Sequence, residues 1–182
     1  MQAKKVPPNT FWSLLTYSRS IELTFAENRK AALKAFAHAG EEAPPPKYIS
    51  ESLDLLKVHR SDYGIRCLED GTLTKKVAET KMALITSPLS NLELKVVKDL
   101  RDLPLRKMRD ADLRVMIHSD DPSYSGRYMN ENYLAITEAL DVTKEDLTKL
   151  AINGFQASCM EEGRRTSGST RFKSIINSAG TR

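Results

Sequence analysis

The sequence contains no run of about 18 apolar residues, so it predicts no membrane-spanning helix. A basic pair near the amino terminus, Lys4 and Lys5, is followed by prolines and polar residues, which is not the pattern of a secretory signal. Cysteine is scarce, because Cys67 and Cys159 are the only two and form no C-x-x-C pair. We therefore expect no disulfide framework and a reduced, cytoplasmic protein.

An excess of one charge occurs only at the carboxyl end. The chain carries 28 basic and 24 acidic residues, and the segment 161–182 holds five of the basic and two of the acidic ones. A basic tail can bind nucleic acid, but a solvated tail is the simpler interpretation, and Phe172 is the only aromatic residue in it. We therefore expect no nucleic-acid partner, and we expect residues 163–182 to form a basic, flexible tail.

Short apolar runs alternate with helical patterns along the chain. Four segments predict strands, at 35–38, 58–62, 82–86 and 113–117; the first is a short apolar run typical of a buried strand, and the second is marked by its end at Gly64. Helical patterns occupy 11–34, 50–57, 72–81, 103–112, 130–140 and 143–158. The last of these begins with Thr143 and Asp146 at the spacing of a capping box. The pattern predicts an α/β fold with about four parallel βα units and the helices outside, preceded by an irregular lead and helix start at 1–21.

Four units are half the number in a closed β/α barrel. A complete barrel typically takes about 250 residues, whereas this chain has 182. The sequence therefore predicts a partial TIM-type barrel. In that fold the catalytic residues follow the carboxyl ends of the strands, which makes the residues after each predicted strand the candidates for a site.

Titratable residues follow three of the predicted strands. His38 and Glu41 follow the first, where an imidazole can bind a metal and a carboxyl group can donate a proton. Asp62-Tyr63-Gly64 ends the second strand. His118-Ser119-Asp120-Asp121-Pro122 follows the fourth, and two adjacent carboxylates there favour a cation or a shared proton. In an extended strand, His118 and Asp120 would point to the same side.

Each cluster also has a purely structural interpretation. His38 can be a buried core histidine, and Gly40 can be an ordinary turn glycine. The Asp120-Asp121-Pro122 segment can simply begin a turn, because Asp and Pro both favour turns. The occurrence of all the clusters at strand ends favours one shared site.

Several segments resemble motifs of the adenosine and adenine deaminase family. They are A-H-A-G-E-E-A-P at 37–44, R-S-D-Y-G-I-R-C-L-E-D at 60–70, S-P-L-S-N at 87–91, S-D-D-P at 119–122 and N-E-N-Y at 130–133. The third resembles the family's C-P-L-S-N, and that form and the S-D-D-P stretch are closer to adenine than to adenosine deaminases. The resemblance runs from about residue 22 to residue 162 and implies the carboxyl-terminal half of a deaminase barrel, 22–162.

The resemblance implies a zinc-dependent hydrolase that removes the 6-amino group of a purine base or nucleoside as ammonia. In the family, a metal-bound water attacks C6 of the purine, because the metal lowers the pKa of that water. By position, His38 and Asp120 would ligate one zinc ion. Glu41 would protonate purine N1, Asp121 would bind N7, and Gly40 would line the purine site.

The chain departs from the family at positions that carry the chemistry. The family's H-x-H zinc motif is absent, since the chain has three histidines and none two residues apart. Tyr63 stands where the family has its catalytic histidine, and an ordinary tyrosine pKa of about 10 makes it a poor base near neutral pH. Catalytic zinc usually has three protein ligands, so we expect weak zinc binding; His118 is a candidate for a third ligand.

Two interpretations follow from these departures. The first is a deaminase by descent, inactive or nearly so as an isolated chain, in which a second chain or self-association would supply the missing half barrel at the open sheet edges. The second is a catalytically inactive paralogue or fragment that is at most a purine-binding module. The replacement at Tyr63 favours the second, because the loss of half a barrel does not explain a point replacement.

Overall fold

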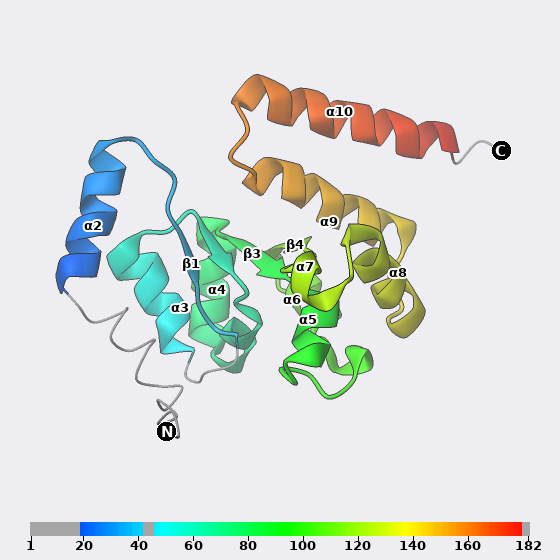
Figure 1. Cartoon of the computed structure of the whole chain (residues 1–182), viewed down its shortest axis with the longest axis horizontal. Coiled ribbons are helices and arrows are strands. Elements are labelled where there is room, and N and C mark those ends of the chain that lie inside the picture. Colours follow the sequence, from blue (N-terminus) through cyan, green and yellow to red (C-terminus); the bar gives the residue numbers. More distant parts are fainter. Residues whose placement is uncertain (1–18, 42–45, 180–182) are drawn as a thin grey trace.

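The computed structural model describes residues 19–41 and 46–179. Its elements are, in chain order, α2 (Arg19–Lys30), β1 (Phe36–His38), α3 (Lys47–Glu51), η1 (Ser52–Leu56), β2 (Arg60–Asp62), η2 (Ile65–Glu69), α4 (Gly71–Thr80), β3 (Ala83–Thr86), α5 (Pro88–Glu93), η3 (Leu100–Asp102), α6 (Leu105–Asp110), β4 (Arg114–Ile117), α7 (Pro122–Ser125), α8 (Met129–Ala139), α9 (Lys144–Ala157) and α10 (Glu162–Ala179). The predicted irregular lead, the first turns of the helix predicted at 11–34, and Glu42 lie outside the described residues. Figure 1 shows the strands at the centre with helices around them.

The four strands form one parallel sheet in the order β1-β2-β3-β4. Each strand pairs with its neighbour in the chain, and helical segments connect consecutive strands, as in a β/α barrel. The predicted α/β class with four parallel βα units is confirmed. All four strands were predicted within one or two residues. β1, β3 and β4 lie in short apolar runs, whereas β2 is polar and is marked only by the turn that follows it at Gly64.

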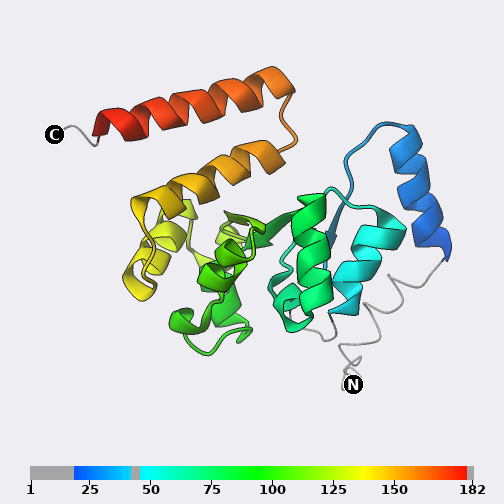
Figure 2. The same ribbon diagram turned by 180° about the vertical axis from the view of Figure 1, so that it is seen from behind.

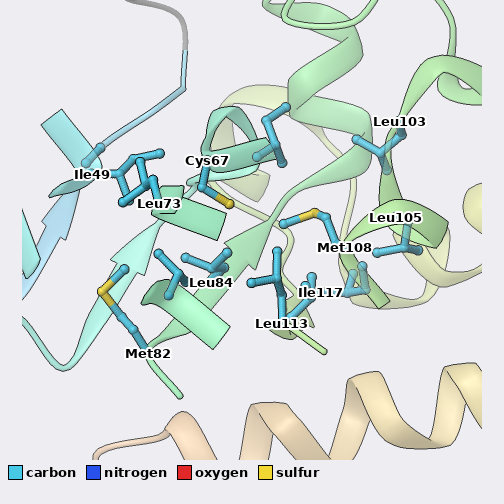
Figure 3. Close-up of a cluster of buried hydrophobic side chains, with 14 of the residues drawn as sticks. Ile49, Cys67, Leu73, Met82, Leu84, Leu103, Leu105, Met108, Leu113 and Ile117 are labelled. Carbon is cyan, nitrogen blue, oxygen red and sulfur yellow. The ribbon is translucent and has the colours of Figure 1, made fainter. Parts of the chain in front are cut away.

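One apolar cluster fills the space between the sheet and its helices (Figure 3). Leu84 of β3, Ile49 of α3 and Met108 of α6 are completely buried. Burial of such side chains supplies most of the stability, about 25 cal/mol for each Å² of apolar surface removed from water. The cluster therefore fixes the sheet, and with it the loops that leave its carboxyl edge.

Helix caps fix the starts of two helices, the crossover helix α4 and the helix α9 that follows β4. Asp70 begins α4, and its side chain accepts hydrogen bonds from the backbone N–H groups of Thr72 and Leu73 at 2.8 and 3.1 Å. Thr143 and Asp146 form the predicted capping box at the start of α9, with reciprocal bonds of 3.1 and 3.0 Å. These local signals are visible in the sequence, which is why the starts of both helices were predicted closely.

The carboxyl-terminal segment differs from its prediction. Residues 162–179 form the helix α10, whereas a loose tail was predicted from residue 163. Helix α10 lies along α9 in both views (Figures 1 and 2), with the Phe172 ring 6.0 Å from that of Phe155 and Lys144 Nζ donating to Ile176 O at 3.2 Å. The Gly, Ser and Thr residues of this segment favour helix weakly, so packing on α9 outweighs local propensity. No helix within 19–41 and 46–179 is long and apolar enough to cross a membrane.

Candidate active site

A cluster of polar side chains lies where the strands end. The Tyr63 hydroxyl, just after β2, donates to Oδ2 of Asp120, after β4, at 2.6 Å. The same oxygen accepts a hydrogen bond from Ser90 Oγ of α5 at 2.5 Å. The His38 ring, at the end of β1, lies 5.6 Å from the Tyr63 ring between centroids, tilted by 48°. The structure thus brings together residues that follow β1, β2, β3 and β4, as the parallel topology predicts.

Left-handed backbone conformations turn the chain at this edge. Gly40 has a φ of +74°, a conformation that glycine adopts without strain. A Cβ atom at this position would also lie only 2.4 Å from Ile49 Cδ1, so a side chain would clash there. Tyr63 and Asp120 also have positive φ, at +80° and +61°. Such conformations cost a residue with a side chain about 1–2 kcal/mol each. The hydrogen bond between these two side chains therefore joins two strained positions, which is typical of functional sites.

Tyr63 is a hydrogen-bond donor in this environment. Its side chain is buried, with 4% of the residue exposed. Burial raises the pKa of its hydroxyl far above the ordinary value, and the hydrogen bond to Asp120 and the neighbouring Glu41 carboxylate raise the pKa further. The hydroxyl therefore stays protonated and cannot act as a base near neutral pH.

Glu41 and Gly40 lie beside the same cluster. Glu41 is half-buried, and its charge and its hydrogen bond to Tyr63 contribute to the raised pKa of that tyrosine. Gly40 is buried between Ile49 and the Cα atom of Gly64. Glu41 thus approaches the cluster from the β1 side, opposite the side from which Asp120 enters.

The two other candidates after β4 behave differently. Asp121 is exposed, and its Oδ1 accepts hydrogen bonds from the backbone N–H groups of Ser123 and Tyr124, at 3.0 and 3.2 Å, as the N-cap of α7. The turn interpretation accounts for these bonds. His118 is exposed, and its Nδ1 accepts a hydrogen bond from the Asp120 backbone N–H at 2.9 Å. The premise of an extended strand through Asp120 was wrong, because β4 ends at Ile117.

The histidine after β1 also corrects an expectation. His38 is exposed, so the interpretation of a buried core histidine was wrong. Its ring contacts Tyr63 rather than an apolar core. Among the described residues, no group of three or more His, Cys, Asp or Glu side chains comes together in a way that could hold a metal ion. His38 and Asp120 therefore do not form a complete zinc centre within this part of the chain, and His118 does not complete one.

Sequence reasoning assigned no role to Ser90 or Asn91. Both belong to the S-P-L-S-N segment, and their signal is that polar residues stand inside a buried stretch. Ser90 binds Asp120, as described above. The side-chain atoms of Asn91 and the hydroxyl of Thr86 are buried without a hydrogen-bond partner in the described part of the chain. Buried polar groups are normally paired, so the end of β3 is where a bound polar group would gain most.

A cavity of about 570 Å³ lies away from these residues, against α6, β4 and α9. Its floor is apolar, and two of its arginines, Arg106 and Arg109, are paired with Asp141 and Asp146 at 2.6 and 2.9 Å. The titratable residues at the strand ends do not line it. We therefore base the functional argument on the strand ends.

A parallel β/α sheet with polar and titratable residues at the carboxyl ends of its strands is the arrangement of the β/α-barrel enzymes. The sequence matches the adenosine deaminase family over residues 15–169, and the chain belongs to that family. It is 50% identical over 144 residues to the adenine deaminase of Sphingopyxis alaskensis, which covers 79% of this chain and 42% of that protein. The family resemblance of the motifs is thereby confirmed.

Two solved structures share the fold. The crystal structure of adenine deaminase from Arthrobacter aurescens superposes with a TM-score of 0.82 at 34% identity, covering 86% of this chain and 48% of that chain. An amidohydrolase from Burkholderia ambifaria, solved with bound zinc, superposes with a TM-score of 0.78 at 21% identity, covering 97% of this chain and 47% of that one. The second likeness shows the fold alone. The chain spans less than half the length of each of these relatives.

Proposed function

We propose that this chain supplies the carboxyl-terminal half of an adenine deaminase active site, the half that binds and protonates the purine. The observation that carries the proposal is the hydrogen-bonded cluster of Tyr63, Ser90 and Asp120 with Glu41 and His38 at the strand ends. The adenine deaminases at about 50% identity support adenine as the substrate. The reaction is the hydrolytic release of the 6-amino group as ammonia.

The residues of this chain have two tasks toward the purine. Glu41 donates a proton to N1 as a carboxylic acid, which makes C6 more electrophilic. Asp121 hydrogen-bonds to N7 of the purine. Gly40 allows the chain to pass close to the purine at the end of β1, where a side chain would clash with Ile49.

The described residues alone do not complete the site. Zinc would need at least one ligand from outside them, in addition to His38 and Asp120. A second chain, or a second copy, would supply it through the sheet edge at β1. Cys67 and Cys159 are free thiols, which supports a reduced, cytoplasmic location.

The test is ammonia release from adenine, with adenosine in parallel, by the purified chain with added zinc, together with adenine binding by calorimetry. We expect no ammonia above background and adenine binding that weakens about 10-fold in Glu41→Ala, which removes the hydrogen-bond donor to N1. Glu69→Ala, on the exposed end of η2, is the matched control. Ammonia release by the isolated chain contradicts the proposal. Adenine binding that is equally tight in wild type and in the Glu41 variant also contradicts it.

The second candidate function is a purine-binding module that has lost catalysis. The buried, protonated Tyr63 favours it, since a catalytic base is absent at that position. Co-expression with the part of the Sphingopyxis alaskensis enzyme that this chain does not match separates the two candidates. Restored ammonia release supports a deaminase half-site, whereas adenine binding without ammonia supports the binding module.

A further inference from the structure

One side chain contacts both of the expected metal ligands. The ring of Tyr63 lies beside the His38 imidazole, with 5.6 Å between the ring centroids. The hydroxyl at the other end of the same side chain donates to Asp120 Oδ2 at 2.6 Å. Tyr63 therefore contacts one ligand with its ring and the other with its hydroxyl.

The Asp120 carboxylate is held by protein donors. Its Oδ2 also accepts the hydrogen bond from Ser90 Oγ at 2.5 Å. A carboxylate oxygen has about two lone-pair sites, so the two hydroxyl groups occupy both of those on Oδ2. A metal that binds this oxygen must displace Tyr63 or Ser90.

A shared zinc ion requires a different arrangement. Zinc binds imidazole nitrogen and carboxylate oxygen at about 2 Å, so two ligands of one tetrahedral ion lie only about 3 Å apart. A side chain that contacts both expected ligands, one through its ring and the other through its hydroxyl, competes with an ion for the space that both ligands face. Tyr63 and Asp120 both have a positive φ, a conformation that residues with a side chain adopt only uncommonly.

We propose that the Tyr63 side chain occupies the metal position of this half-site and closes it to zinc. The inference deepens the proposed function and rests on it only for the assignment of His38 and Asp120 as the residues that face a metal. The shortage of ligands is then not the only obstacle to zinc, because both ligands that the chain has are in contact with a third residue.

The test is a zinc chloride titration of the chelator-treated full chain by isothermal titration calorimetry. We expect wild type and Asp120→Asn to give the same isotherm. Tyr63→His removes the phenol and adds a ligand, so we expect one zinc ion bound about 10-fold tighter or more than by wild type. That gain should disappear in the double variant Tyr63→His/Asp120→Asn. Tyr128→His is the matched control, because it adds a histidine at an exposed tyrosine outside the site.

Two results overturn the proposal. One is zinc binding by wild type that Asp120→Asn abolishes. The other is a Tyr63→His variant that keeps the circular dichroism spectrum and melting temperature of wild type but binds zinc no more tightly than wild type does. If Tyr63→His does not fold, Tyr63→Gly replaces it, because glycine suits the φ of +80° and opens the same space. A folded Tyr63→Gly variant without Asp120-dependent zinc binding also contradicts the proposal. The titrations contain no purine, so their outcome is separate from that of the deaminase assay.

Discussion

The two halves of the sheet differ in burial, and the site lies across both. β3 and β4 pair along four residues, and all of their residues except Arg114 are buried. β1 and β2 have three residues each, and only Ser61 among them is buried. Asp120 and Ser90 thus follow the buried pair, whereas His38 and Tyr63 follow the partly exposed pair. The comparison shows that the site joins a pair of strands that is almost wholly buried to a pair that is partly exposed.

The outer edge of the buried half is covered as well. Asn153 of α9 is buried, and its Nδ2 donates to the backbone oxygen of Val115 in β4 at 2.6 Å. On the other edge, β1 ends at the exposed His38, and Phe36 is only partly buried with Arg60 over its ring at 4.1 Å. Unpaired strand edges favour association with other chains, so the β1 edge is the side at which we expect association.

The largest predicted effect compares one apolar residue from each half. Leu84→Ala removes a completely buried side chain of β3 and should lower the free energy of unfolding by about 2–5 kcal/mol. Phe36→Ala removes a larger side chain that remains partly in water, and we expect a loss of only about 1–2 kcal/mol. Urea unfolding followed by circular dichroism measures both. Equal losses would show that the two halves contribute alike.

The next effect concerns the covered edge. Asn153→Ala leaves the Val115 backbone oxygen without its donor and should cost about 1–3 kcal/mol. Gln156→Ala, at an exposed position of the same helix, is the control and should change the stability by less than about 0.5 kcal/mol. If both variants unfold at the same urea concentration as wild type, α9 does not protect β4.

The smallest predicted effect on stability concerns the N-terminal cap of α9, the helix that covers β4. Hydrogen bonding to Thr143, assisted by Arg109, lowers the pKa of Asp146. A lowered pKa in the folded state adds stability that is present above the unfolded pKa of about 4 and is lost as the pH falls through the folded value. Asp146→Ala should therefore cost about 1 kcal/mol at pH 7 and less near pH 3. A difference that does not change between those pH values would contradict a role for the charge.

Local patterns in the sequence account for the strands, and the topology then accounts for most of the site. Once four parallel strands are assigned, the residues after them must meet at one edge, which is why His38, Glu41, Tyr63 and Asp120 could be grouped. The bond from Ser90 to Asp120 was not predictable in this way. It joins residues 30 positions apart and depends on the orientation of the short helix α5. Hydrophobic periodicity in the sequence does not predict that orientation.

Two further features were not predicted from the sequence, for other physical reasons. The Asn153 bond to Val115 depends on how α9 crosses the edge of β4, which is a property of packing rather than of either segment. Helix α10 was missed because its composition favours a coil and its partner, α9, is recognised only in three dimensions.

The strand order has a kinetic consequence. Every pair of neighbouring strands is consecutive in the chain, so the sheet can grow by one crossover at a time, with short loops to close. The contact of Tyr63 with Asp120 is different, because it spans 57 residues and passes over β3. It can form only after three strands are in register, since loop-closure entropy must first be overcome. We therefore expect the edge that carries Tyr63 and Asp120 to be the last region to order during refolding, with amide protons that exchange sooner than those of β3.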